Sequence, residues 1–249
     1  MSENKVDFNT EWFREWFDSP YYHVLYSHRD EAEAKNFLDR LDTHLNLPLA
    51  ASVLDLACGK GRHSVYLSSK GYDVHGIDLS IESIQYAKQF ENDLLHFDVQ
   101  DMRYFDLSKQ FDCILNLFTS FGYFQNIEEN LTVLKRIKTH LNKNGIFVLD
   151  YFNPKAICAK MAPEHQCKNS GVLFDIKKSI RDGQVIKEIQ VTDGNKKEYF
   201  VERVQLLEFE TMQSMLHAAG LTYVHAFGDY NLKVFQPESS ERMIIIARN

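Results

Sequence analysis

The chain of 249 residues has no run of about eighteen consecutive apolar residues, the length that a helix needs to cross a membrane. Its first residues, MSENKVDFNTEW, are polar and acidic and lack the apolar segment of a secretory signal peptide. The sequence therefore predicts a cytoplasmic protein without a membrane segment.

Basic clusters are also scarce. No run of Lys and Arg is longer than pairs such as Lys177-Lys178 and Lys196-Lys197, and the net charge is −7 at pH 7. Proteins that bind nucleic acid normally carry a basic face, because neutralising phosphates supplies most of their affinity. We therefore expect no nucleic-acid partner, and a small-molecule substrate is favoured.

Cysteine is rare and its spacing is uninformative for metal binding. The four cysteines, Cys58, Cys113, Cys158 and Cys167, form no CxxC pair and have no histidine at metal-ligand spacing. Cys58 and Cys113 lie in apolar, strand-like runs, where cysteine behaves as a small core residue. No metal site is expected.

The chain does contain a regular alternation of strand and helix patterns. Expected strands cover 53–57, 72–77, 93–98, 111–117 and 145–151, and expected helices cover 62–70, 81–90 and 127–141. Strands that alternate with helices form βαβ units and a parallel sheet with helices on both faces. The sequence thus predicts an α/β fold.

The pattern changes after Pro154. Three strand-like runs at 172–181, 184–191 and 198–207 are separated by Asp-Gly pairs, which are strong hairpin signals. They predict an antiparallel β insert after the fifth strand. A helix at 210–219 and strands at 221–227 and 243–248 then complete the sheet. The expected organisation is a single domain with a helical cap (1–45), a cofactor-binding core (50–155), the β insert (170–208) and a C-terminal completion of the core (209–249).

The stretch VLDLACGKGRH, from Val53 to His63, ends the first strand with two glycines and opens a helix. Ligands of open α/β sheets bind at the carboxyl ends of the strands, where glycine lets the backbone approach closely. Asp78 ends the second strand 19 residues after Gly59, and an acidic residue at about that distance hydrogen-bonds ribose hydroxyls. Together, these features indicate a nucleotide site.

Two ligand classes compete for this site. A nicotinamide-dependent reductase would place a third glycine at position 64, where this chain has Ser64. Asp55, by contrast, lies in the first strand ahead of the glycines, where a carboxylate suits a ligand with a cationic end such as an amino-acid ammonium. The sequence favours the second class and keeps the reductase as the alternative.

Four segments in order resemble S-adenosylmethionine-dependent methyltransferases of the seven-stranded Rossmann-like class, in the branch that acts on small molecules. They are Asp55 to Gly61 (DLACGKG), Gly76 to Ser80 (GIDLS), Asp98 to Met102 (DVQDM) and Phe111 to Phe118 (FDCILNLF). The resemblance covers about residues 35–155 and 205–249. It implies a mostly parallel seven-stranded sheet, S-adenosylmethionine as cofactor, and in-line methyl transfer to a small molecule. A catalytically silent module that binds S-adenosylmethionine is the non-enzyme alternative.

The resemblance also implies roles for individual residues. Gly59 and Gly61 would let the loop pass under the methionine part, and Asp55 would face its ammonium. Asp78 would hold the ribose hydroxyls. The adenine would be held by its amino group at Asp101 and by packing on Leu79 and Met102. The other expected cofactor contacts are Tyr22, Ala57, His63, Asn116 and Phe118.

The loop after the fourth strand, from Asn116 to Tyr123, would lie beside the transferred methyl group. It lacks the Asn-Pro-Pro-aromatic signature of amino-methyltransferases that modify nucleobases and glutamine. Thr119 and Ser120 are candidate polar contacts there. No catalytic base is assigned; the candidates are His23, Tyr22 and Tyr123, and methylation of nitrogen, oxygen or carbon stays open.

Aromatic residues are concentrated before the first strand. Residues 8–29 include Trp12, Trp16, Tyr21 and Tyr22, which predicts either a lid over the methyl-transfer site or an aromatic helix packed permanently against the rest of the chain. A lid would exclude water from the displacement. A homodimer is left open as a further alternative.

Overall fold

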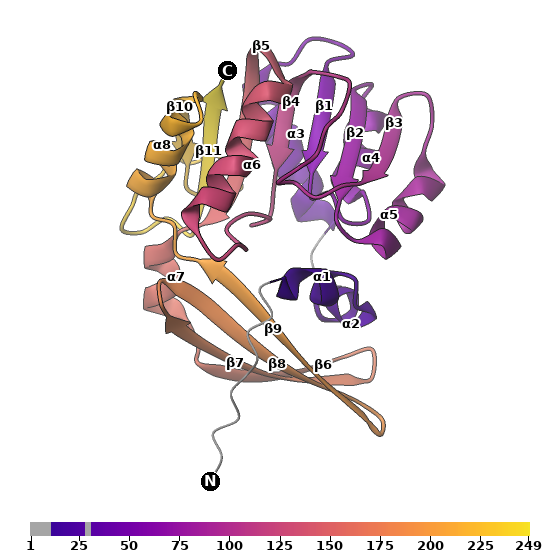
Figure 1. The fold of residues 1–249 in the computed structure, drawn as a ribbon, viewed down its shortest axis with the longest axis vertical. Coiled ribbons are helices and arrows are strands. Elements are labelled where there is room, and N and C mark those ends of the chain that lie inside the picture. Colours follow the sequence, from indigo (N-terminus) through magenta and orange to yellow (C-terminus); the bar gives the residue numbers. More distant parts are fainter. Residues whose placement is uncertain (1–10, 28–30) are drawn as a thin grey trace. The chain divides into compact units, whose positions relative to one another are not determined.

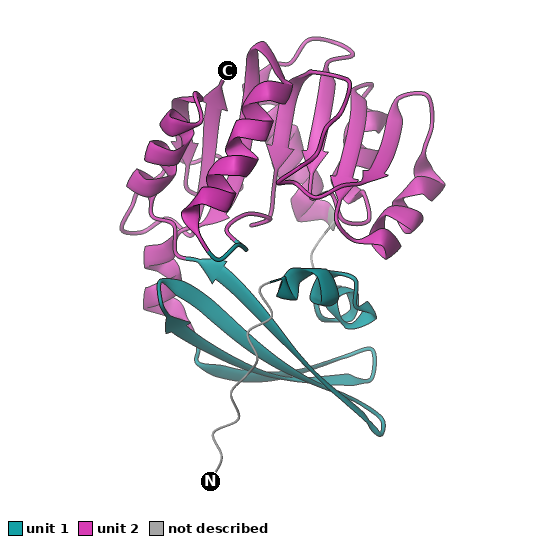
Figure 2. Ribbon diagram, in the orientation of Figure 1, with its two compact units in different colours: residues 1–28, 123–125, 162–205 teal, residues 29–122, 126–161, 206–249 magenta. Residues whose placement is uncertain are grey.

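The computed structural model describes residues 11–27 and 31–249. The chain forms two compact units (Figure 2). Unit 1 comprises the described part of residues 1–28 together with 123–125 and 162–205, and unit 2 comprises the described part of 29–122 together with 126–161 and 206–249. The expected cofactor core lies in unit 2, and the expected β insert lies in unit 1.

Unit 2 contains a seven-stranded sheet with the order β10-β11-β5-β4-β1-β2-β3. Its strands are β1 (Ser52–Leu56), β2 (Asp73–Asp78), β3 (Leu95–Val99), β4 (Phe111–Asn116), β5 (Leu141–Phe152), β10 (Thr222–Phe227) and β11 (Arg242–Arg248). The pairs among β1 to β5 are parallel, and β11 is antiparallel to both β5 and β10. The predicted α/β, mostly parallel seven-stranded sheet is confirmed.

Unit 2 also contains helices, of which α3 (Glu31–Leu45) and α6 (Ile127–His140) lie on opposite faces of this sheet (Figure 1). Further helices are α4 (Arg62–Ser69), α5 (Ile81–Ala87), α7 (Pro154–Lys160) and α8 (Phe209–Ala218), with a short 3-10 turn, η1, at Lys88–Phe90. Helices α3, α4 and α5 share one apolar cluster with the strands, whereas α6 and α8 contact each other. Figure 1 shows α6 and α8 in front of the sheet and α3 behind it.

Local sequence explains where several of these helices begin and end. Ser80 and Asn126 cap α5 and α6 by accepting hydrogen bonds from the N–H groups of Ser83 and Glu129, each at 3.0 Å. Helix α8 is followed by Gly220, whose φ of 80° is left-handed, as expected for glycine after a helix. Helix α7 was not expected from the apolar pattern.

Unit 1 contains a four-stranded antiparallel sheet with the order β6-β7-β8-β9. The strands are β6 (Glu164–Asn169), β7 (Val172–Arg181), β8 (Gln184–Asp193) and β9 (Lys196–Gln205). Asp182 and Gly183 have φ values of 51° and 70°, so the predicted Asp-Gly hairpin between β7 and β8 is confirmed. Strand β6 was not expected, because its sequence EHQCKN is polar and mostly exposed.

Two short helices, α1 (Trp12–Phe17) and α2 (Pro20–Leu25), belong to the same unit. Trp16 is fully buried, and its ring centroid lies 4.7 Å from that of Phe200 in β9. Ser19 caps α2 and Pro20 is its first residue, so the aromatic segment forms two short helices instead of one. The tryptophans are core residues of unit 1, as in the packed alternative. Residues 8–10 and 28–29 of the expected lid lie outside the described residues, and the lid stays a prediction.

Within 11–27 and 31–249, none of the helices has the length and apolar character that crossing a membrane requires. The four cysteines are free thiols, and Cys58 and Cys113 are buried in the core of unit 2, as the sequence predicts.

Candidate functional site

The strand order of unit 2 reverses at β1. The chain runs from β1 to β2 and β3 on one side and then crosses to β4, which pairs with the other side of β1. Such a topological switch point opens a crevice at the carboxyl ends of the strands, and ligands of α/β sheets bind there. The loops that follow β1 and β4 are therefore the first candidates for a site.

Both loops contain residues with a left-handed backbone conformation, as do several turns elsewhere in the chain. Ala57 follows β1 with a φ of 62°, and Phe118 and Thr119 follow β4 with φ values of 56° and 65°. A left-handed conformation costs a residue with a Cβ about 1–3 kcal/mol, and such residues cluster at functional sites. The left-handed residues after β1 and β4 support a ligand site at the switch point.

The glycine turn has two different requirements. A Cβ on Gly61 would lie 2.6 Å from Cζ of Phe97, so the packing of unit 2 excludes a side chain there. A Cβ on Gly59 would meet nothing within 4 Å, although its φ of 55° favours glycine. Open space over a left-handed backbone is what the close approach of a ligand needs.

Asp55 is 1% exposed in β1, and its carboxylate accepts a 2.6 Å hydrogen bond from the hydroxyl of Ser64 in α4. Burial raises the pKa of Asp55 to about 6, against the lowering effect of the Ser64 hydrogen bonds. The carboxylate thus ties the strand to the helix across the glycine turn. A cationic ligand group nearby would stabilise its ionised form, so its expected contact with the methionine ammonium stays a prediction.

Asp78 lies at the end of β2, next to the glycine turn. Its Oδ2 accepts a 2.8 Å hydrogen bond from the N–H of Gly59, and its Oδ1 accepts one of 2.8 Å from the N–H of Ser80. A carboxylate has about four acceptor sites, so these bonds are compatible with ribose hydroxyls. The structure brings Asp78 and the glycine turn together, as the sequence predicts.

The loop that follows β3 contains an ion pair that sequence reasoning missed. The Arg103 guanidinium, on a residue 5% exposed, donates to both carboxylate oxygens of Asp101 at 2.6–3.2 Å and to Oε1 of Glu129 at 2.9 Å. Asp101 is thereby fixed against the first turn of α6. Its expected bond to the adenine amino group stays a prediction, as do the contacts of Leu79 and Met102, both half-buried.

Asn116 ends β4 with a fully buried amide. Its Nδ2 donates to the carbonyl oxygens of Leu56 at 3.0 Å and Ser120 at 3.1 Å, which links β1 to the loop after β4. Its Oδ1 has no hydrogen-bond partner among the described residues. The expected cofactor contact of Asn116 stays a prediction.

The two loops are joined by stacked rings. The imidazole of His63 stacks on the ring of Phe118 with centroids 4.9 Å apart and planes 8° apart, and the Arg62 guanidinium lies 5.3 Å from the same ring. Arg62 also lies within hydrogen-bond distance of Nε2 of His63, at 3.2 Å. His63 therefore orders the glycine loop against the β4 loop.

Asp150 in β5 is the centre of a network that sequence reasoning also missed. The fully buried carboxylate accepts from the N–H of Phe118 at 2.8 Å and from the hydroxyl of Tyr230 at 3.2 Å. Arg242 donates to it through Nε at 2.9 Å and Nη2 at 2.6 Å, and Nη2 also donates to Oγ1 of Thr119 at 2.9 Å. This network holds the strained turn. The sequence feature that could have revealed this network is the Asp inside the apolar run FVLDYF.

The three candidate catalytic residues belong to unit 1. The ring of Tyr22 lies 5.0 Å from that of Phe17 and 5.4 Å from that of His23, and the ring of Tyr123 lies 5.1 Å from that of Phe17. They are part of one aromatic cluster with Trp12, whose ring centroid lies 5.6 Å from that of Tyr123. A catalytic role for Tyr22, His23 or Tyr123, and the cofactor contact of Tyr22, stay predictions.

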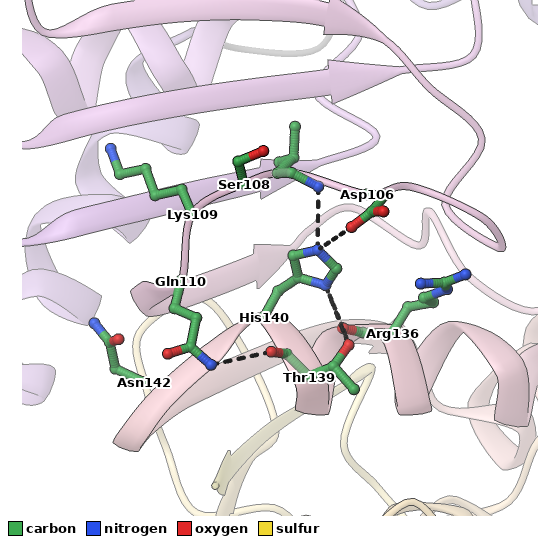
Figure 3. Close-up of a pocket in the computed structure, with 9 residues that line it drawn as sticks. Asp106, Ser108, Lys109, Gln110, Arg136, Thr139, His140 and Asn142 are labelled. Carbon is green, nitrogen blue, oxygen red and sulfur yellow. Dashed lines mark hydrogen bonds and ion pairs between the residues drawn. The ribbon is translucent and has the colours of Figure 1, made fainter.

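A pocket is also present, away from the carboxyl ends of the strands. It has a volume of about 610 Å³ and is lined by residues 106–110 ahead of β4 and by the end of α6 (Figure 3). His140 lies at its centre, with Nδ1 2.8 Å from the carbonyl oxygen of Arg136 and Nε2 3.2 Å from the N–H of Leu107. Both ring nitrogens thus have partners within the fold, and Nε2 also lies 3.8 Å from Oδ1 of Asp106. His140 is a structural link there.

The described residues contain no group of three or more His, Cys, Asp or Glu side chains arranged to hold a metal ion.

The family of the chain follows from comparison with known proteins. Residues 50–213 match the family model described as a methyltransferase domain, so the chain belongs to the methyltransferase domain family. A structure of an S-adenosylmethionine-dependent methyltransferase from Clostridium acetobutylicum has the same fold, with a TM-score of 0.78, 20% identity, and coverage of 92% of this chain and 95% of that one.

Curated relatives are similar over shorter stretches. A dTDP-3-amino-3,4,6-trideoxy-alpha-D-glucopyranose N,N-dimethyltransferase of Streptomyces venezuelae is 32% identical over 120 residues, which are 48% of this chain and 49% of that protein. A glycine/sarcosine N-methyltransferase of Halorhodospira halochloris is 27% identical over 211 residues, 80% of this chain and 76% of that protein. The chain spans about half the length of the first of these relatives.

S-adenosylmethionine is the cofactor that accompanies the family, and the residues at the switch point fit it. The open space over Gly59 and the carboxylate of Asp78 beside it suit a ligand with ribose hydroxyls. The expectation of S-adenosylmethionine is confirmed, and the nicotinamide alternative is set aside by the family match.

Proposed function

We propose that the protein transfers a methyl group from S-adenosylmethionine to a nitrogen atom of a small amine. The observation that carries the proposal is the match of residues 50–213 to a methyltransferase domain, together with the left-handed turn at Phe118 and Thr119 at the switch point of that domain. The names of similar proteins, an amino-sugar N,N-dimethyltransferase and a glycine/sarcosine N-methyltransferase, support the same acceptor class.

S-adenosylmethionine supplies a methyl group activated by its sulfonium. The amine nitrogen forms the new N–C bond while the S–C bond breaks, S-adenosylhomocysteine leaves, and the methylated nitrogen loses a proton to water. A neutral amine needs no strong base for this step, unlike an alcohol or phenol. Positioning then supplies most of the rate, which agrees with a turn at Phe118 and Thr119 that is held rigidly by Asp150 and Arg242.

The acceptor proposal is tested by incubating the protein with methyl-labelled S-adenosylmethionine and, separately, a dTDP-amino sugar, glycine, sarcosine and a matched panel of alcohols and phenols. We expect label on nitrogen with at least one amine and none with the oxygen acceptors. Methylated oxygen would overturn the choice of nitrogen. Binding of S-adenosylhomocysteine without any methylated product, in this panel or in a cell extract, would favour the catalytically silent module.

The cellular setting is part of the proposal. The net charge of −7 favours a small-molecule acceptor over a nucleic acid. The free thiols of Cys58 and Cys113 suit the reducing cytoplasm. A homodimer stays a prediction, which sedimentation of the full chain checks.

A further inference from the structure

A row of charged side chains crosses the sheet of unit 1. Lys178 in β7 lies directly opposite Lys187 in β8, and Lys187 lies directly opposite Glu202 in β9. Directly opposite residues in an antiparallel sheet point to the same face. Two ammonium groups and one carboxylate are therefore placed side by side on a single face.

The charge of Lys187 is matched within this row. Its Nζ lies 3.2 Å from Oε2 of Glu202, whose carboxylate also accepts hydrogen bonds from Nε1 of Trp16 and the hydroxyl of Tyr26, each at 2.6 Å. Burial alone would raise the pKa of Glu202, but Lys187, Tyr26 and Trp16 hold it below its ordinary value. Glu202 is thus ionised and already fully engaged by partners within unit 1.

The charge of Lys178 is only partly compensated, by the Glu202 carboxylate that is already paired with Lys187. The Lys178 side chain is half-buried, and within the described residues no carboxylate forms an ion pair with it. Burial, followed by the neighbouring ammonium of Lys187, lowers the pKa of Lys178, and the opposing attraction of Glu202 only partly offsets them. Like charges directly opposite each other in a sheet are destabilising, so the free chain carries an electrostatic cost at this position.

A third basic group lies on the same face. His165 in β6 is paired with Ile176, which is two residues from Lys178, so His165 and Lys178 are diagonal neighbours about 7–8 Å apart at Cα. Burial, and then Lys178 and Lys187, lower the pKa of His165. Three basic residues on three adjacent strands therefore share one face of the sheet with the carboxylate of Glu202.

We propose that Lys178, Lys187 and His165 form a binding site for a small anionic group, a phosphate or a carboxylate. An anion beside Lys178 supplies the counter-charge that Glu202 provides only in part and turns the repulsion between the two lysines into a shared attraction. Partial burial strengthens this attraction relative to an exposed lysine. The proposal depends on contacts within unit 1 alone and is independent of the methyl transfer proposed above.

The test measures the binding of inorganic phosphate, pyrophosphate and succinate to the full chain by calorimetry at low salt. We expect at least one of them to saturate a single site, and Lys178→Gln to weaken that binding at least tenfold. The matched control is Lys177→Gln. The side chain of this adjacent lysine points to the other face of the sheet, and its Nζ lies 3.4 Å from Oε1 of Glu164. This variant should leave binding unchanged. Preference for phosphate or for succinate identifies which of the two groups the site takes.

A second readout needs no ligand. Because Lys178→Gln removes the repulsion with Lys187, it should raise the melting temperature of the free protein at low salt, and the gain should shrink as salt is added. The bound anion should raise the melting temperature of the wild type and of Lys177→Gln, but not that of Lys178→Gln. Equal loss of binding in both variants, or no saturable binding of any of the three anions, would overturn the proposal.

Discussion

Replacing Asp150 with Asn tests how the strained turn after β4 is held. The wild-type carboxylate is fully buried and accepts from the backbone of Phe118 at 2.8 Å and from Arg242 at 2.6 and 2.9 Å. An amide of the same shape has a single acceptor oxygen, and its NH₂ group faces donors instead of accepting from them. Asp150→Asn therefore removes a negative charge and hydrogen-bond acceptors without leaving a cavity.

The magnitude follows from the burial of both partners. Removing one member of a buried ion pair costs about 3–5 kcal/mol, because the other charge is left uncompensated. The Arg242 side chain is 20% exposed, so water can solvate part of its guanidinium. We therefore expect Asp150→Asn to lower the free energy of unfolding by about 3 kcal/mol, at the lower end of that range.

Denaturant unfolding of Asp150→Asn, Arg242→Gln and the double variant gives the coupling between the two residues. Contacting residues in one network show coupling of about 0.5–3 kcal/mol, and we expect a value in the upper half of that range. Asp106→Asn is the control for the loss of one charge, since that carboxylate is 85% exposed. Methyl transfer by Asp150→Asn should fall about tenfold or more, because the left-handed Phe118 and Thr119 relax once their anchor is lost.

Two results would refute this reasoning. A cost below about 1 kcal/mol for Asp150→Asn would show that the charge pair is solvated and contributes little. Additive effects in the double variant would show that Asp150 and Arg242 act separately, and that the turn owes its conformation to other contacts.

Three further outcomes follow from the cofactor end of the sheet. Asp78→Ala should weaken binding of S-adenosylhomocysteine by about 1–3 kcal/mol in calorimetry, and an unchanged affinity in a folded variant would make the residue structural. Gly61→Ala, whose new Cβ would lie 2.6 Å from the Phe97 ring, should lower the free energy of unfolding by about 1–3 kcal/mol. Gly59→Ala should instead weaken the binding of S-adenosylhomocysteine more than it lowers the free energy of unfolding. A larger loss of stability than of binding in Gly59→Ala would contradict the role of Gly59 in the close approach of a ligand. Burial raises the pKa of Asp55 to about 6 in the folded chain, above roughly 3.9 when unfolded. Folding therefore takes up a proton between these values, and the free energy of unfolding should fall as pH rises from about 4 to 6. Unfolding curves of Asp55→Asn should lack this fall; an identical pH profile would contradict the shift.

The parts of the site that the sequence predicted are those encoded locally. The glycine turn and Asp78 lie within 19 residues of each other. A local strand-turn-helix unit brings them together without contacts from distant parts of the chain. The Asp182-Gly183 hairpin is local in the same sense, since two left-handed residues suffice to set it. Short-range rules decide such features, so a single sequence can predict them.

The parts that were missed depend on distant partners or on weak patterns. Arg242 is separated from Asp150 by 92 residues, and nothing in either neighbourhood specifies the other. Strand β6, Glu164–Asn169, is a polar edge strand, so it lacks the alternation by which a strand is recognised. Arg103 was overlooked because a charged residue in a loop is usually solvated, whereas here it is 5% exposed between two carboxylates.

Each loop at the switch point is anchored by a buried carboxylate. Asp55 in β1 holds α4 through Ser64 and so fixes the glycine turn, while Asp150 in β5 holds the β4 loop through the N–H of Phe118. The stacked rings of His63 and Phe118 then join one loop to the other. A transfer reaction that depends on positioning needs this kind of support, since a displacement of about 1 Å can cost a hundredfold in rate. The carboxylates that interrupt the apolar runs of β1 and β5 are thus explained by the same requirement: each holds a strained loop in place before any ligand arrives.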